Sequence, residues 1–269
     1  MPGNVRDNPG VTSMSDFDRN YATARAGYRT DQVTTDAGLR AYMIRVYNYM
    51  ASGVALTGIV SWLTYQAAGG DAIQVSGGRI SGLTVFGQAI FGGPLTIVLA
   101  LGTLGLVFFM SYRINRLSVG TALSLFFIYA GLLGLMLSSV FLSYTGTSIT
   151  RVFFISAATF GSLSLYGYTT KRDLGPVGSF LIMGLIGIVI ASLVNIFLAS
   201  SGLSWMISVI GVLVFAGLTA WDTQRIKEMY SVNDDGTIAG RKAVMGALSL
   251  YLDFINLFIM LLRIFGDRR

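Results

Sequence analysis

Two aspartates lie in stretches of this sequence that are otherwise apolar enough to cross a membrane. Asp222 occurs in GLTAWDTQRIK and Asp253 in LSLYLDFINLF, whereas nearly all other acidic residues fall in polar segments. Inserting a carboxylate into hydrocarbon costs about 3 kcal/mol or more, so an acid in such a place is by default functional and requires a partner. Two facing carboxylates cannot both ionise cheaply in a low dielectric, so the expected chemistry is a shared proton or a bound cation.

The spacing of the two aspartates predicts that they meet. The polar segment SVNDDGTIAGRK separates the two apolar stretches, so these form consecutive antiparallel helices. Asp222 lies about one turn before the end of its helix, and Asp253 lies about two to three turns into the next one. Both carboxylates therefore reach similar depth from the same side, and Asp222 is the expected partner of Asp253.

The helix around Asp253 carries a polar seam. At about 100° per residue, Ser249, Asn256, Met260 and Arg263 fall on the same side of the helix as Asp253. A helix with such a seam is expected inside a bundle, where its polar groups are shielded from lipid. The alternative is a structural aspartate that accepts a hydrogen bond from a hydroxyl group or caps the backbone.

Composition indicates an integral membrane protein. The chain has 269 residues, of which 53% are hydrophobic and 12% are charged, against about 25% charged in soluble domains. Charged residues are absent from 46–70, 80–112, 117–150, 152–170 and 174–221. The sequence has no cysteine and no histidine, which excludes disulfides, thiol chemistry and histidine-based metal or proton sites. The net charge of +6 is explained by membrane topology, so a nucleic-acid partner is not expected.

The uncharged intervals predict an all-α polytopic membrane protein with seven transmembrane helices. The helices are expected at about 45–69, 85–112, 117–142, 151–170, 177–200, 203–227 and 244–266. Residues 1–40 are polar and lack the apolar centre of a signal peptide, so they are expected to form a mobile cytoplasmic tail. Residues 41–269 then form the transmembrane domain.

Lysine and arginine predict the orientation. With a cytoplasmic N-terminus, the inner loops hold Arg113, Arg116, Lys171, Arg172, Arg225, Lys227, Arg241 and Lys242 in addition to the arginines of the tail. The outer loops then hold only Arg79 and Arg151, which favours this orientation. Arg263, Arg268 and Arg269 fall on the outer side, however. A last helix that turns back, or only six crossings, would bring these three arginines inside.

Three segments resemble the Bax inhibitor-1 family. ALSLYLDFINLFIMLLRIFG, residues 247–266, resembles the last helix of that family, TAWDTQRIK is similar to its sixth helix, and RVYNYMASGVALTG is similar to its first. The likeness covers residues 40–266, and the tail and the 230–244 loop resemble those of Gram-negative members. The resemblance implies a seven-helix bundle with the last helix central, in the bacterial inner membrane. It also implies a pH-dependent calcium leak channel.

The same resemblance implies roles for particular residues. Asp222 and Asp253 match the family's paired aspartates, which act as pH sensor and weak calcium site. A basic latch near the end of the second helix is also implied, with Arg113 as the candidate and Arg116 as the alternative. Calcium prefers six to eight oxygen ligands, whereas two carboxylates supply at most four, so binding should be weak, as conduction requires. Calcium and protons are thus expected as cargo, and no resident cofactor is expected.

Two other functions compete with the channel. The resemblance implies that some bacterial relatives bind and restrain a membrane-bound ATP-dependent protease through the N-terminal tail, which residues 1–40 would provide. An intramembrane aspartyl protease also carries one aspartate on each of two neighbouring helices. That enzyme requires Gly-x-Gly-Asp and a later Pro-Ala-Leu, but here LSLYL precedes Asp253 and no Pro-Ala-Leu follows. We therefore do not expect an enzyme.

Overall fold

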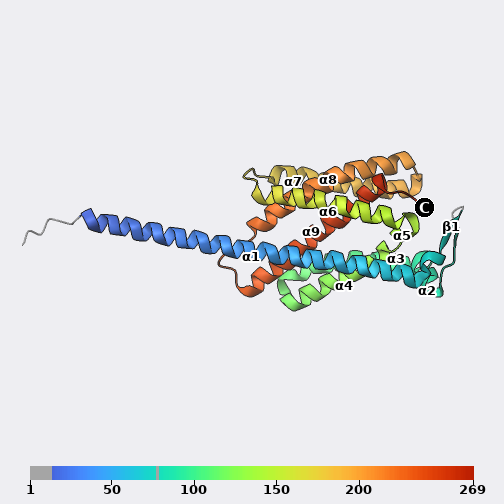
Figure 1. Ribbon diagram of the computed structural model, residues 1–269, viewed down its shortest axis with the longest axis horizontal. Coiled ribbons are helices and arrows are strands. Elements are labelled where there is room, and N and C mark those ends of the chain that lie inside the picture. Colours follow the sequence, from blue (N-terminus) through green and yellow to red (C-terminus); the bar gives the residue numbers. More distant parts are fainter. Residues whose placement is uncertain (1–13, 77–78) are drawn as a thin grey trace, which may run out of the picture. The chain divides into compact units, whose positions relative to one another are not determined.

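The computed structural model describes residues 14–76 and 79–269. A boundary between two compact units falls after Ala41, and the unit from Tyr42 to Arg269 contains both aspartates. The helices are α1 (Met14–Ala68), α2 (Val85–Gly92), α3 (Leu95–Arg113), α4 (Val119–Leu137), α5 (Val140–Ser143), α6 (Gly146–Thr169), α7 (Gly175–Leu198), α8 (Ser201–Glu228) and α9 (Gly236–Phe265). The 3-10 turns η1 (Gly70–Ala72) and η2 (Ile114–Arg116) and the strands β1 (Gln74–Ser76) and β2 (Arg79–Ser81) complete the fold (Figure 1).

The all-α membrane fold predicted from the sequence is confirmed, with differences in the first half of the chain. Helix α1 begins at Met14, so residues 14–40, predicted as part of a mobile tail, are helical; residues 1–13 lie outside the described part. The mobility of this tail stays a prediction. The helix predicted at 85–112 is divided, because Gly93 is extended and Pro94 lacks an amide hydrogen. The antiparallel hairpin β1–β2 was not predicted.

Six helical segments of the described chain are long and apolar enough to cross a membrane. Five of them are the single helices α3, α6, α7, α8 and α9, and the sixth consists of α4 together with α5. The predicted first crossing, 45–69, forms the last part of α1 and is not among them. Its inward face carries the buried polar side chains of Thr57, Ser61 and Thr64, which lower its mean hydropathy. The seven-helix count is therefore not confirmed, and α1 accounts for the difference.

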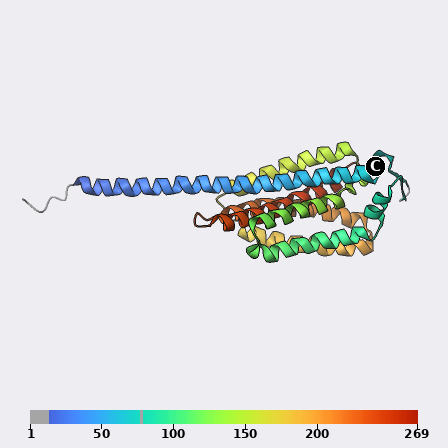
Figure 2. The same cartoon turned by 90° about the horizontal axis from the view of Figure 1, so that it is seen from below.

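Helix α9 is the centre of the bundle, as the sequence predicts. Of an 18-residue apolar stretch of α9, 72% is buried inside the protein. The corresponding share is 44% in α8 and only 11% in α3 and in α7. It packs against α4, α6 and α8, and Figures 1 and 2 show it enclosed by its neighbours. The buried Tyr251 contributes to this packing: its hydroxyl lies 2.6 Å from Oγ1 of Thr57 in α1, and its ring meets the edge of Phe126 in α4.

The C-terminal residues hold one end of α9 in place. The amide of Asp267 donates to Ser148 Oγ at 2.9 Å, and the Asp267 carboxylate pairs with Arg151 at 2.9 Å. The guanidinium of Arg269 donates to the Tyr65 hydroxyl at 2.9 Å, near the end of α1. We call this the C-terminal end of the bundle. Helix α9 is unbroken over 30 residues and does not turn back, so Arg263, Arg268 and Arg269 lie at this end.

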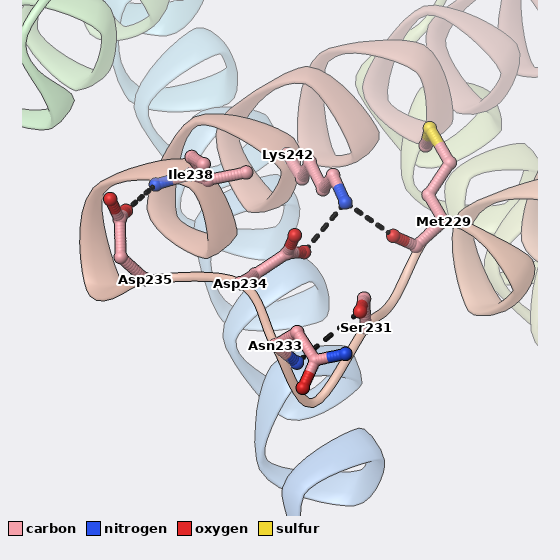
Figure 3. A network of polar contacts seen from close by, with 7 residues as sticks. All are labelled: Met229, Ser231, Asn233, Asp234, Asp235, Ile238 and Lys242. Carbon is pink, nitrogen blue, oxygen red and sulfur yellow. Dashed lines mark hydrogen bonds and ion pairs between the residues drawn. The ribbon is translucent and has the colours of Figure 1, made fainter.

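A polar network holds the other end of α9, which we call the loop end (Figure 3). The ammonium of Lys242 donates to Asp234 Oδ2 at 2.6 Å and to the carbonyl of Met229 at 2.8 Å. Asp235 caps the helix by accepting a hydrogen bond from the amide of Ile238 at 2.7 Å. These contacts fix where α9 begins after α8, and therefore the depth at which its aspartate lies.

Candidate functional site

Helices α8 and α9 cross closely, which allows their two aspartates to meet. A Cβ atom on Gly246 of α9 would lie 3.0 Å from Ile226 of α8. Further along, a Cβ atom on Gly211 of α8 would lie 2.9 Å from Met260 of α9. Glycine at both positions therefore brings the two backbones together, as small residues do between helices in lipid.

The structure brings Asp222 and Asp253 into contact. Their carboxyl groups lie side by side, close enough to form a hydrogen bond when one of them carries a proton. The side chain of Asp253 is only 5% exposed, and its Oδ2 atom has no hydrogen-bond partner among the described residues. A buried carboxylate oxygen without a donor is costly, so this arrangement favours one proton, or a cation, between the two groups.

Arg225 is a third charged residue at the pair. It follows Asp222 by three residues on α8 and lies near enough for its charge to act on the Asp222 carboxylate. Its guanidinium also stacks over the ring of Trp221, 5.4 Å from the ring centre. Arg225 was predicted from the sequence only as a charge that sets the topology, although its spacing of three residues from Asp222 was a signal for this contact.

The pair lines a cavity of about 570 Å³ between α7, α8 and α9, which we call the aspartate cavity. Ser249 and Asn256 of the predicted seam also line this cavity, as do Arg225 and Met260. The amide nitrogen of Asn256 donates to the carbonyl of Leu252 at 2.8 Å. The rest of the wall is mainly aliphatic side chains of α7. The cavity therefore places a few polar groups in apolar surroundings.

The three predicted arginines lie elsewhere. Arg263, the last member of the seam, lines a separate cavity at the C-terminal end. Arg113 ends α3 and Arg116 lies in η2, and both are exposed. Neither lines the aspartate cavity in the described structure. Their role as a latch stays a prediction.

The donor set suits a weakly held cation. Among the described residues, no group of three or more acidic side chains is placed to hold a metal ion. Asp222 and Asp253 offer at most four carboxylate oxygens, so calcium would need water or other oxygens to complete its usual six to eight ligands. The arrangement can therefore exchange a proton for a cation, but it is not a closed metal site.

Behind the pair, a chain of hydroxyl groups joins three helices. The hydroxyl of Tyr47 in α1 lies 2.7 Å from Ser164 Oγ in α6, which in turn lies 2.9 Å from Thr223 Oγ1 in α8. Thr223 follows Asp222 directly, so the chain fixes the turn of α8 that presents the carboxylate. Isolated hydroxyl residues in apolar helices gave no sequence signal for this pairing.

The fold and the site define a class: a multi-pass α-helical membrane protein with an ionisable pair at the core of its bundle. Residues 39–269 match the model of the family described as Inhibitor of apoptosis-promoting Bax1. The chain therefore belongs to the Bax inhibitor-1 family, which confirms the resemblance seen in the sequence. This is a family of membrane proteins and not a known class of enzyme.

Relatives match over most of the chain. An uncharacterised protein of Rickettsia prowazekii is 49% identical over 236 residues, which cover 88% of this chain and 93% of the relative. The inner membrane protein YbhL of Escherichia coli is 46% identical over 244 residues, which cover 90% of this chain and 98% of the relative. An uncharacterised membrane protein of Streptococcus pyogenes is 39% identical over 232 residues, which cover 86% and 95%.

Proposed function

We propose that this protein is a pH-sensitive calcium leak channel of the bacterial inner membrane, with its N-terminus in the cytoplasm. The observation that carries the proposal is the contact between the buried carboxyl group of Asp253 and the half-buried one of Asp222, on the wall of a cavity between the apolar helices. Ionisable residues inside the membrane are expensive and commonly mark ion or proton pathways. In this proposal calcium is the transported ion, protons regulate its flux, and the protein lies in the lipid bilayer.

The charge of the pair changes with pH, and this change supplies the gate. With one proton, the two carboxyl groups form a hydrogen bond that holds α8 against α9. Without it, two negative charges about 4 Å apart repel each other by about 4 kcal/mol at an effective dielectric constant of about 20. A divalent cation that enters between them relieves this repulsion, so protons and calcium compete for the same place.

The groups around the aspartate pair favour rapid exchange of a bound cation and not tight binding. Among the described residues lining the aspartate cavity, Arg225 is the charged side chain besides the two aspartates. It is exposed, so it can leave the Asp222 carboxylate when a cation arrives. The neutral side-chain oxygens of Ser249 and Asn256 are further ligands that the cavity offers. Such a site binds calcium weakly, so the ion can also leave it, as conduction requires.

Calcium flux into proteoliposomes between pH 5 and pH 8 tests the proposal. Asp222→Asn and Asp253→Asn each remove one ionisable group with little change in size. Asp173→Asn is the matched control, because this exposed aspartate lies in the turn between α6 and α7. We expect a pH-dependent leak in the unmodified protein and in the control, and a flattened pH profile in both site variants.

Two results would overturn parts of the proposal. A pH profile that survives both site substitutions would show that the pair is not the sensor. A complete lack of flux at every pH would remove the channel itself, and restraint of a membrane-bound protease through the N-terminal tail would become the better function.

A further inference from the structure

A second cavity, of about 680 Å³, lies at the C-terminal end of the bundle, and we call it the arginine cavity. Its lining combines two arginines with hydroxyl and amide groups from α7 and α8. The polar members of the lining are Arg263, Arg268, Ser192, Asn195, Ser201, Ser204, Ser208 and Tyr144. Trp205 lines the same cavity. This composition differs from that of the aspartate cavity, which is mainly aliphatic.

The charge of the arginine cavity is positive. Arg263 and Arg268 both line it, and no acidic side chain does so among the described residues. The ion pairs of the described chain are Arg151–Asp267 and Lys242–Asp234, so neither of these arginines is neutralised by one. Guanidinium groups stay protonated at any physiological pH. The cavity therefore keeps two uncompensated positive charges.

The two arginines come from separately fixed parts of the backbone. Arg263 belongs to the last turns of α9. Arg268 follows the end of that helix and is held by an antiparallel bridge to Tyr144, next to the hydrogen bond from the amide of Arg269 to the carbonyl of Ser143 at 3.1 Å. Because the backbone is fixed separately at the two positions, the guanidinium groups of these exposed residues can bind one anion from different directions, as arginines bind phosphate.

The opposite wall of the arginine cavity supplies neutral donors. The amide nitrogen of Asn195 donates to Ser204 Oγ at 2.7 Å, which leaves the Ser204 hydroxyl hydrogen available for another acceptor. The amide oxygen of Asn195 accepts from the backbone of Ser200 at 3.1 Å and orders the turn before α8. Ala199 in this turn has a left-handed backbone with φ of 48°. The 28-residue helix α8 begins here, and its N-terminal dipole also favours an anion.

The arginine cavity continues into apolar surroundings. It shares Ser192 and Ile196 with the aspartate cavity, so the two adjoin along α7. The exposed side of α7 presents Val189, Leu193 and Ile196, which are 51%, 56% and 72% exposed. Ten residues of α9 separate Arg263 from Asp253, a rise of about 15 Å, which is about the depth of one leaflet. An acyl chain held at the arginines would reach the region of the aspartate cavity.

We propose that the arginine cavity binds the phosphate of an anionic phospholipid, with one acyl chain along α7. The phosphate lies between Arg263 and Arg268 and accepts hydrogen bonds from hydroxyl groups of the α8 start. The exposed apolar side of α7 distinguishes a lipid from free phosphate, which shares the same anion chemistry. This inference does not depend on calcium conduction.

Tryptophan fluorescence of the purified full-length protein in detergent tests the site. Trp205 reports on the arginine cavity when Trp62 and Trp221 are replaced by phenylalanine. The titrants are short-chain phosphatidylglycerol, short-chain phosphatidylcholine and inorganic phosphate. We expect saturable binding of phosphatidylglycerol, and binding at least tenfold weaker for the zwitterionic lipid and for phosphate. Arg263→Gln and Arg268→Gln should each weaken phosphatidylglycerol binding by about tenfold.

Arg172→Gln is the control, because Arg172 is exposed in the turn between α6 and α7 and does not line the cavity. It should leave lipid binding unchanged, and circular dichroism checks that each variant is folded. Equal binding of the two lipids, or unchanged binding in both arginine variants, would overturn the proposal. Binding of phosphate as tight as that of phosphatidylglycerol would overturn the lipid assignment and leave a site for free anions.

Discussion

Arg225 is the residue whose charge acts most directly on Asp222. A positive charge close to a carboxylate stabilises its ionised form, so Arg225→Gln should let the pair keep its proton to higher pH. We expect the midpoint of the pH-dependent leak to move upward by up to about one pH unit. Arg225→Lys, which preserves the charge, should move it much less. Flux profiles of the two variants measured side by side check this, and a downward shift in Arg225→Gln would contradict it.

Gly167 sets the distance between α6 and α8. A Cβ atom at this position would collide with the backbone oxygen of Ala220, and a backbone atom cannot move aside as a side chain can. Gly167→Ala should therefore destabilise the protein by about 2 kcal/mol. Gly161→Ala on the same helix is the matched control, since nothing lies within 4 Å of its Cβ position. Thermal unfolding in detergent compares them, and equal midpoints would show that α6 and α8 have room to separate.

The N-terminal part of α1 belongs to a different compact unit from the aspartates. Deletion of residues 1–40 should therefore leave calcium flux and its pH dependence unchanged within about twofold. If the tail restrains a membrane-bound protease, the same deletion should abolish that restraint in cells. Flux in proteoliposomes and turnover of the protease's substrates measure the two effects separately. A deletion that abolishes flux would place the tail in the conduction mechanism.

In the molecule as a whole, calcium and protons should compete for one site. In the proposed mechanism, a shared proton occupies the place between Asp222 and Asp253 at low pH, whereas two negative charges attract the cation at high pH. The calcium concentration for half-maximal flux should therefore fall as the pH rises from 6 to 8, by at most about tenfold per pH unit, since one proton is displaced. In Asp253→Asn it should not depend on pH. A constant value in the unmodified protein would rule out competition at the pair.

The contact between the aspartates could be predicted because it depends on local features, namely a polar loop and two antiparallel helices of known rise. The polar seam of α9 likewise predicted that this helix lies inside the bundle, whereas its central place was implied by the family resemblance. Other features depend on distant partners. Arg263 shares a helical face with Asp253, but the packing of α7 and the return of the C-terminus to Tyr144 place it in another cavity. The start of α1 at Met14 could not be predicted from a polar composition.

Helix α9 is fastened at both ends, by Lys242 at the loop end and by the Asp267 and Arg269 contacts at the other. A rod held in this way can rotate or bow, but it cannot slide along its axis. Displacements that widen the aspartate cavity must then come from its least buried wall, which is α7. We therefore expect α9 to keep its position along its own axis and α7 to be the wall of the cavity that moves. The state of the surrounding bilayer, through its thickness and lateral pressure, would therefore set how readily the cavity opens.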